Sequence, residues 1–426
     1  MIFCHRRKRQ KGDFMKKYLL LCLLLIFAAC ATRQMKESEV NFILSIQNGN
    51  TQEVQAAIAK GIDVNTADTD GFTALMHAAI WGNNDIAQLL ISKGADVNAR
   101  SNTKLTALIL AVVNEDAKTV QLLLDKGAFV NVQIINGTLL PAKISKRDVK
   151  EKKGYIKITP TESYKSQMSP LLLASKNGDE EIARMLIAKN ANVNEKTDRE
   201  STPLMFAAEN GYTNIVNMLI DKGADVNATD SDGWTVLMTA SKKEKNADVI
   251  GILLKKGAKV NSVRANGWTA LMYAADSGSA DSVKVLLSNG ADVNGRSVDG
   301  WSALMIASNK GFTDTVKMLL SKKANVNEAL KDGNTSLMMA STGGYTGTVK
   351  ALIDYRADVN LINKNGESAL LIASVQGRTE IVKMLLTRKA DLNIKRYNDG
   401  LTSIKGASLN GHTQIVDLLR KAGASE

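Results

Sequence analysis

The chain is poor in the residues on which disulfide-bonded folds and most enzyme active sites depend. Only three of its 426 residues are cysteine, and none of them lies after Cys30. The rest of the chain therefore has no disulfide and no thiolate chemistry. Histidine is also rare, because only His77 and His412 follow Cys30. We interpret both histidines as structural, and we predict no catalytic residue, no cofactor and no metal site.

Aromatic residues and proline are scarce as well. Aromatics make up 5% of the chain and proline only four residues, whereas 44% of the chain is apolar. Such a composition favours thin layers of helix over a large aromatic core. The net charge of +12 overstates the charge of the rest of the chain, because residues 1–29 carry +6 of it and leave +6 for the remainder. We therefore predict no nucleic-acid partner.

The start of the chain has the pattern of an export signal. Lys16 and Lys17 precede an apolar stretch of 12 residues, Tyr18–Ala29. Positive charge, a short apolar segment and small residues at its end are typical of a secretory signal peptide. At about 1.5 Å per residue this stretch is too short for a hydrocarbon core about 30 Å thick. We predict a signal peptide at residues 1–29, with Met15 as an alternative start of translation.

The end of this signal carries a further motif. The segment Ile26-Phe27-Ala28-Ala29-Cys30 resembles the lipobox of bacterial lipoproteins, except that Phe27 stands where an aliphatic residue is usual. The resemblance implies a lipid on Cys30, a lipidated N-terminus and short linker at residues 30–39, and a place in the bacterial cell envelope, on the periplasmic or outer-membrane side. Cleavage without lipidation is the alternative.

A five-residue segment recurs along most of the chain. Gly-Ala-Asp-Val-Asn stands at Gly94–Asn98, Gly223–Asn227 and Gly290–Asn294. Relaxed copies begin at Gly61, Gly127, Asn190, Gly257, Lys323, Arg356, Lys389 and Gly423. Successive copies are 33 or 34 residues apart, apart from one interval of 63 residues. A fixed period of this length indicates stacked structural repeats.

Each repeat has the signals of two short helices. A hydroxyl residue that can cap the first helix stands at Thr73, Thr106, Ser169, Thr202, Thr235, Thr269, Ser302, Thr335, Ser368 and Thr402. A short apolar helix follows, and a glycine such as Gly82 or Gly311 ends it in most repeats. The second helix has apolar residues at helical spacing, as in Ile86, Leu89 and Leu90.

This pattern resembles the ankyrin-repeat family. The family's Thr-Pro-Leu-His motif has the form Thr-Ala-Leu-Met at Thr73–Met76. The resemblance implies an all-α repeat solenoid of stacked helix-turn-helix units with β-turn fingers, over residues 36–426. We count about eleven repeats, of which the first and last have the polar or truncated character of caps. It also implies a scaffold that binds proteins through its fingers and first helices, and not an enzyme.

Three tryptophans occupy one equivalent position in consecutive repeats. Trp234, Trp268 and Trp301 each follow the glycine of a finger, whereas Asn334 and Glu367 stand there in the next two repeats. Stacking of the repeats predicts a row of indoles. Two interpretations stay open: the indoles anchor a partner, or they pack against neighbouring fingers. Variable helix residues that would complete a partner site in repeats 201–335 are Lys242, Lys243, Asp276 and Asn309.

The long interval contains an insertion at residues 133–167. It has strand-like runs at 138–140 and 155–159, which indicate an elongated β-hairpin finger or a loop. From Lys143 to Lys165 eight residues are basic and three acidic. Residues that could contact an anionic surface are Lys146, Arg147, Lys150, Lys152 and Lys153. A solvated loop is the alternative interpretation.

Taken from the sequence alone, the favoured function is an exported, membrane-tethered scaffold that mediates protein–protein interaction. An unknown protein or peptide is its predicted partner, and the lipid bilayer contacts its N-terminal anchor. One alternative is a soluble secreted or cytosolic ankyrin-repeat effector, and a second is a structural spacer without a specific partner. An enzyme built into the insertion is disfavoured, because residues 133–167 contain no histidine or cysteine.

Overall fold

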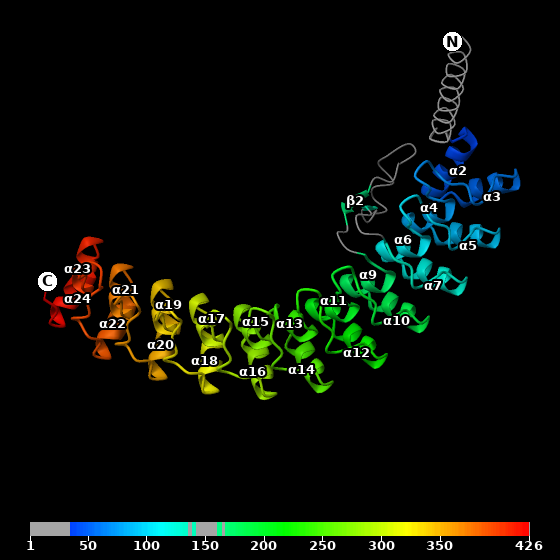
Figure 1. Cartoon of the computed structure of the whole chain (residues 1–426). Helices are drawn as coiled ribbons and strands as arrows, with labels where there is room; N and C mark the ends of the chain where they lie inside the picture. Colours follow the sequence, from blue (N-terminus) through cyan, green and yellow to red (C-terminus); the bar gives the residue numbers. More distant parts are fainter. Residues whose placement is uncertain (1–34, 135–138, 142–159, 164–166, 426) are drawn as a thin grey trace, which may run out of the picture. The chain divides into compact units, whose positions relative to one another are not determined.

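The computed structural model describes residues 35–134, 139–141, 160–163 and 167–425. The chain divides into two compact units, Met1–Pro170 and Leu171–Glu426, each of which is built from consecutive pairs of short helices. Within Leu171–Glu426 the first helices of the pairs form one row and the second helices another (Figure 1). The described helices number 22, so the fold is an all-helical repeat solenoid, as the sequence predicts.

The described residues of the unit Met1–Pro170 form three helix pairs and two short strands. Its elements are α2 (Glu37–Gln47), α3 (Thr51–Ala59), α4 (Ala74–Trp81), α5 (Asn84–Ser92), α6 (Ala107–Val113), α7 (Ala117–Asp125), β1 (Leu139–Pro141) and β2 (Pro160–Ser163). The two strands lie in the insertion and pair antiparallel, with Leu139 opposite Ser163. A bridge between Ile134 and Met168 closes the base of the insertion. Antiparallel strands are thus present in the insertion, and the second of them begins after the predicted run 155–159. That run and the rest of the chain between the two strands lie outside the described residues, so the predicted hairpin stays a prediction there.

The second unit contains eight helix pairs. Its elements are α9 (Pro170–Asn177), α10 (Glu180–Ala188), α11 (Pro203–Asn210), α12 (Thr213–Asp221), α13 (Val236–Ser241), α14 (Ala247–Lys255), α15 (Ala270–Asp276), α16 (Ala280–Ser288), α17 (Ala303–Lys310), α18 (Thr313–Ser321), α19 (Ser336–Gly343), α20 (Thr346–Asp354), α21 (Ala369–Val375), α22 (Thr379–Thr387), α23 (Ser403–Leu409) and α24 (Thr413–Lys421). No helix among the described residues is long and apolar enough to cross a membrane.

Hydroxyl caps begin the first helices. Thr73, Thr106, Thr202, Thr235, Thr269, Ser302, Thr335, Ser368 and Thr402 each accept a hydrogen bond from the backbone N–H three positions on, at 3.1–3.4 Å. Each bond satisfies a helix N–H that has no partner within the helix. Five of the described first helices are followed directly by a glycine in the left-handed conformation, such as Gly311 with a φ of 75°. The predicted cap chemistry is therefore confirmed at these positions.

Apolar residues at fixed places in each repeat form the core. The residue two positions after the cap, such as Leu204, Leu271 or Leu337, is at most 2% exposed. The second helices bury residues such as Val216 and Leu219 completely. Burying one such side chain contributes about 1.5–3 kcal/mol, and neighbouring repeats supply the covering surface. The stack is thus stable only as a series of neighbours.

Asparagine side chains join one repeat to the next. The asparagine of the recurring segment donates from Nδ2 to the glycine carbonyl of the following repeat at 2.9–3.4 Å, as Asn227 does to Gly257. Its Oδ1 accepts a backbone N–H from the same neighbour, such as that of Lys259, at 2.8–2.9 Å. These two hydrogen bonds explain why the recurring segment ends in asparagine, because its side chain links each repeat to the next.

Candidate partner-binding face

Three consecutive fingers carry the predicted tryptophans. Each finger is a tight turn closed by a hydrogen bond from the backbone N–H of its first residue to the backbone carbonyl of the tryptophan. The three pairs are Asp230 with Trp234, Arg264 with Trp268 and Ser297 with Trp301, at 2.9–3.1 Å. We call residues 230–234, 264–268 and 297–301 the aromatic fingers. All three indoles are half-buried, which leaves part of each ring accessible. The structure thus supports packing and exposure together for the same side chains.

Tyr273 links two of the indoles. Its ring centroid lies 4.4 Å from that of Trp234 and 4.9 Å from that of Trp268, with interplanar angles of 35° and 43°. Trp301 makes no such ring contact within the part of the chain that the structure describes. The row of indoles is therefore a three-ring cluster, Trp234–Tyr273–Trp268, followed by a separate indole. The tyrosine was missed by sequence reasoning, although it lies five residues after Trp268 on α15.

Two cations lie over Trp234. The guanidinium carbon of Arg264 lies 4.4 Å from the ring centroid, and the Lys242 Nζ lies 4.9 Å from it. Arg264 also donates to the Tyr273 hydroxyl at 2.9 Å and twice to the backbone carbonyl of Asp232 at 3.0 and 3.1 Å. Because a cation over an indole is attracted by the negative face of the ring, these contacts fix the orientation of Trp234.

Two of the four predicted helix residues, Lys242 and Asp276, form ion pairs within the chain. Lys242 forms an ion pair with Glu209 at 2.8 Å, and Asp276 forms one with Lys310 at 2.6 Å. Both pairs link first helices of neighbouring repeats. Exposed pairs of this kind contribute roughly 0–1 kcal/mol, so they orient the side chains more than they stabilise the stack. Lys243 and Asn309 are exposed on the same rows.

A small hollow lies beside Trp234. Its volume is about 200 Å³. It lies between α11, α13 and the first aromatic finger, and its lining residues are Arg199, Ser201, Met205, Phe206, Glu209, Asp230, Asp232, Trp234, Thr239 and Lys242. Phe206 and Trp234 supply half-buried aromatic surface, while Met205 and Thr239 are buried. This hollow was not predicted, because it depends on side chains from two repeats.

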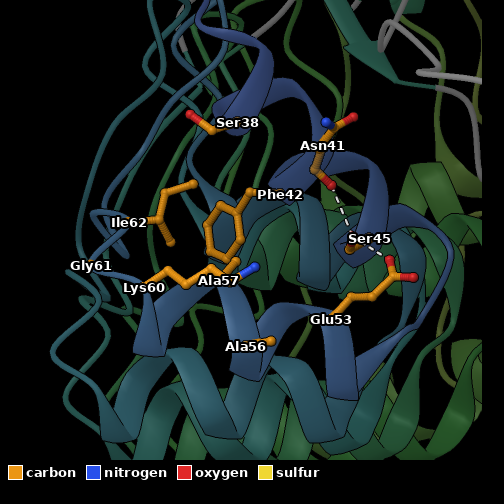
Figure 2. A pocket seen from close by; sticks show the side chains of 10 residues that line it. All are labelled: Ser38, Asn41, Phe42, Ser45, Glu53, Ala56, Ala57, Lys60, Gly61 and Ile62. Carbon is orange, nitrogen blue, oxygen red and sulfur yellow. Dashed lines mark hydrogen bonds between the residues drawn. The ribbon is translucent and has the colours of Figure 1, made fainter.

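A larger hollow lies in the first repeat, between α2 and α3. Its volume is about 480 Å³ (Figure 2). Phe42 and Ile62 line one side, and Glu53 accepts a hydrogen bond from the Ser45 hydroxyl at 2.7 Å on the other. Its mixed lining contains no histidine or cysteine. Across the described residues, no group of three or more histidine, cysteine, aspartate or glutamate side chains could hold a metal ion.

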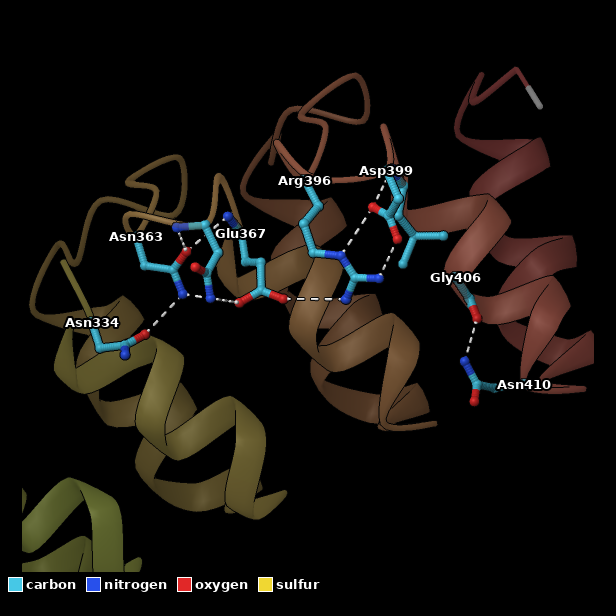
Figure 3. A network of polar contacts seen from close by, with 9 residues as sticks. Asn334, Asn363, Glu367, Arg396, Asp399, Gly406 and Asn410 are labelled. Atoms are coloured by element: carbon cyan, nitrogen blue, oxygen red, sulfur yellow. Dashed lines mark hydrogen bonds and ion pairs between the residues drawn. The ribbon is translucent and has the colours of Figure 1, made fainter. Parts of the chain in front are cut away.

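The fingers after the aromatic ones are polar and bonded to each other. Asn363 donates to Asn334 and to Glu367, both at 3.0 Å, and Arg396 contacts Glu367 at 3.5 Å (Figure 3). Arg396 also donates twice to the Asp399 carboxylate, which lowers the pKa of Asp399 to about 2. We call residues 330–334, 363–367 and 396–401 the polar fingers. Their side chains bond mainly to one another.

The two predicted structural histidines are both bonded within the stack. His77 is 0% exposed, and its Nε2 lies 3.0 Å from the Asp68 carboxylate while its Nδ1 lies 3.4 Å from the Gln47 amide. The His412 Nε2 lies 3.1 Å from the Val375 carbonyl. Burial raises the pKa of Asp68, but the hydrogen bond and charge of His77, with two backbone N–H bonds, outweigh it and lower the pKa overall.

Several predicted site residues lie outside the described residues. These are Cys30 and the insertion residues Lys146, Arg147, Lys150, Lys152 and Lys153. Lipidation at Cys30 and anionic contact by the insertion therefore stay predictions.

The sequence matches one protein family over most of its length. A family model described as ankyrin repeats, in three copies, matches residues 18–101, 42–134, 153–230, 227–297, 294–363 and 344–425. No curated protein matches the chain. The matched segments cover most of the sequence, and within the described residues they contain the fingers and the helices given above. The chain therefore belongs to the ankyrin-repeat family.

Proposed function

We propose that this protein is an exported, membrane-tethered scaffold that binds a protein or peptide partner on its aromatic fingers. Ankyrin-repeat proteins are in general interaction scaffolds without enzymatic activity, so protein partners follow from the family. The observation that carries the position of the partner is the pair of half-buried indoles of Trp234 and Trp268, which pack on the buried ring of Tyr273 and keep part of their own surface accessible. Exposed aromatic anchors of this kind supply much of the binding energy of protein interfaces.

The contrast with the polar fingers supports this placement. Asn363, Glu367 and Arg396 bond to neighbouring side chains of the chain itself. A partner would have to break those bonds before it could replace them, which costs free energy. The indoles have no comparable cost, because burial of their exposed part is favourable by itself.

An affinity-capture experiment tests the partner site. Wild-type protein and the variant Trp268→Ala would be used as baits, and captured proteins would be quantified by mass spectrometry. We expect a specific protein to be captured by the wild type and reduced at least tenfold by Trp268→Ala. Tyr355→Ala is the matched control, since Tyr355 is 44% exposed but lies at the end of α20. Equal capture by a folded Trp268→Ala would overturn this site.

The membrane tether rests on the signal-like start and on Cys30. Covalent attachment of lipid anchors a protein according to the buried acyl length, and a basic segment adds attraction to anionic lipid head groups. The insertion supplies such a segment, with a net charge of +5 between Lys143 and Lys165. Cleavage without lipid would instead give the soluble effector.

Metabolic labelling with a clickable fatty acid tests the tether. We expect the wild type to carry the label and to sediment with membranes, and Cys30→Ser to lose both properties. An unlabelled, soluble wild type would favour the soluble effector. Replacing Lys146, Arg147, Lys150, Lys152 and Lys153 with glutamine should reduce residual binding of Cys30→Ser to anionic vesicles. Unchanged vesicle binding would contradict the anionic contact.

A further inference from the structure

We propose that the hollow beside Trp234 seats one neutral aromatic side chain of the partner protein. This inference rests on the proposed interaction function and names the anchor that the scaffold recognises. The hollow lies next to the three-ring cluster, at the junction of α11, α13 and the first aromatic finger.

The size of the hollow fits a single side chain. Its volume of about 200 Å³ is below the roughly 300–1,000 Å³ of pockets that enclose whole small molecules. Met205, 3% exposed, and Thr239, 8% exposed, lie at its buried side, and Phe206 and Trp234 offer half-buried rings. Two aromatic walls at such a site allow the edge-to-face or offset contacts that aromatic rings prefer.

The charges around the hollow favour a neutral occupant. Three carboxylates line it, from Glu209, Asp230 and Asp232, together with two cations, Arg199 and Lys242. Arg264 adds a third cation beside Asp232 and Trp234. The balance is close to zero, so neither a carboxylate nor a cation of the partner gains a net attraction large enough to offset its loss of hydration.

A cationic anchor is disfavoured for a second reason. An aromatic wall usually attracts arginine or lysine through its negative face. At Trp234 the chain already places Arg264 and Lys242 within 4.9 Å of the ring centroid. A third cation over the ring would be repelled by these two. A phenol or phenyl ring instead meets the apolar surface of Phe206 and Trp234, and the hydroxyl group of a phenol can also reach the carboxylates that line the hollow.

Fluorine NMR of the full chain tests this anchor without a known partner. The chain has four tryptophans, so 5-fluorotryptophan places one reporter at each of Trp81, Trp234, Trp268 and Trp301. The probes are p-cresol, n-propylguanidinium and propionate, which stand for tyrosine, arginine and glutamate side chains. We expect p-cresol to shift the Trp234 resonance in a saturable way. Trp301, at the equivalent position, should not respond, and nor should Trp81, which is 5% exposed.

Two variants make the result specific. Thr239→Phe fills the hollow and Phe206→Ala removes one aromatic wall, so each should weaken p-cresol binding at least tenfold. Met339→Phe is the matched control, because Met339 holds the position of Thr239 in another repeat. The proposal is overturned if p-cresol gives no saturable shift at Trp234, if n-propylguanidinium or propionate gives a larger one, or if binding survives in both variants. Because the titration needs no partner, its failure is distinguishable from failure of the affinity capture.

Discussion

Asp68 with His77 and Arg264 with Tyr273 occupy the same two positions of their repeats. In both pairs the first residue begins a finger and the second lies four residues after the helix cap, and the side chains meet at 3.0 and 2.9 Å. The side chains of His77 and Asp68 are 0% and 1% exposed, whereas Arg264 is half-buried beside the indoles. One contact geometry therefore seals the core in one repeat and supports an accessible face in another.

The difference lies in what the neighbouring repeat supplies. Gln47, on α2 of the first repeat, contacts His77 and closes the pair from one side. Trp234, in the preceding finger, instead packs on Tyr273 and Arg264 and leaves part of its ring accessible. The same two positions of the repeat therefore stabilise the core in one repeat and orient an accessible indole in another. The chemistry of the neighbour decides which of the two results.

Breaking the buried pair of Asp68 and His77 should have the largest effect on stability. Asp68→Ala leaves the buried Nε2 of His77 without its hydrogen-bond partner, and an unsatisfied buried polar group costs about 1–3 kcal/mol. We expect α2 to α5 to lose protection, measured by hydrogen exchange of the full chain. Asp232→Ala, at an exposed finger, is the control and should change protection little. Equal effects of the two substitutions would contradict the comparison.

Removing an accessible indole should change binding more than stability. Trp268→Ala should weaken partner binding by about 2 kcal/mol, or roughly 30-fold, as expected for an aromatic hot spot. Asn334→Ala changes the equivalent position of the first polar finger and should leave affinity within a factor of two. Isothermal titration with the captured partner measures both variants. A larger loss for Asn334→Ala would reverse the proposed division of the fingers.

Acid should distinguish the two pairs. The pKa of Asp68 is lowered in the folded protein, so its contribution to stability is present above the unfolded pKa of about 3.9 and is lost as pH falls through the folded value. The Arg264–Tyr273 pair contains no carboxyl group and makes no such contribution. Below about pH 4, protection from hydrogen exchange, taken relative to the intrinsic exchange rate at each pH, should fall first in α2 to α5 of the wild type. In Asp68→Asn this acid dependence should be smaller, and an unchanged dependence would refute the assignment.

Changing the pair of Arg264 and Tyr273 should reduce stability less than changing the buried pair of Asp68 and His77. Arg264→Met removes the hydrogen bonds to Tyr273 and to the Asp232 carbonyl but keeps an apolar contact with Trp234. We expect a loss of about 1 kcal/mol, because the group is half-exposed and water replaces part of the bonding. Local exchange of α13 and α15 is the measurement. Loss as large as that of Asp68→Ala would mean that both pairs are core elements.

The smallest effect is expected in the polar fingers. Glu367→Gln removes the charge that faces Arg396 while the amide can still accept from Asn363. Stability should fall by less than about 1 kcal/mol, and the difference should shrink in high salt. Thermal unfolding at two salt concentrations measures this. A loss that salt does not reduce would indicate a packing role for Glu367.

Much of the fold could be predicted because it is local in sequence. The caps at Thr235 or Ser302 follow from residues within one repeat, and the period of 33 residues and the equivalent positions of Trp234, Trp268 and Trp301 follow from comparing repeats along the sequence. The division into two units at Pro170 was not predicted. The insertion was located, but only the short pairing of Leu139 with Ser163 and its neighbours is described.

The site was harder to predict because it forms between repeats. Tyr273 reaches Trp234, and Arg264 reaches Asp232, across about one full repeat. Which side chains meet at that distance depends on the stacking of the helices and on rotamers, neither of which periodicity reveals. For the same reason Lys242 was predicted as a partner contact without its ion pair to Glu209.

The most direct test of the account is site-specific photo-crosslinking in living cells from two equivalent positions. A photoreactive amino acid would replace Trp268 in one protein and Asn334 in another, and the products would be identified by mass spectrometry. The account predicts one dominant adduct from position 268 and none from position 334. An adduct confined to position 334, or no adduct from position 268 while partner capture persists, would contradict it.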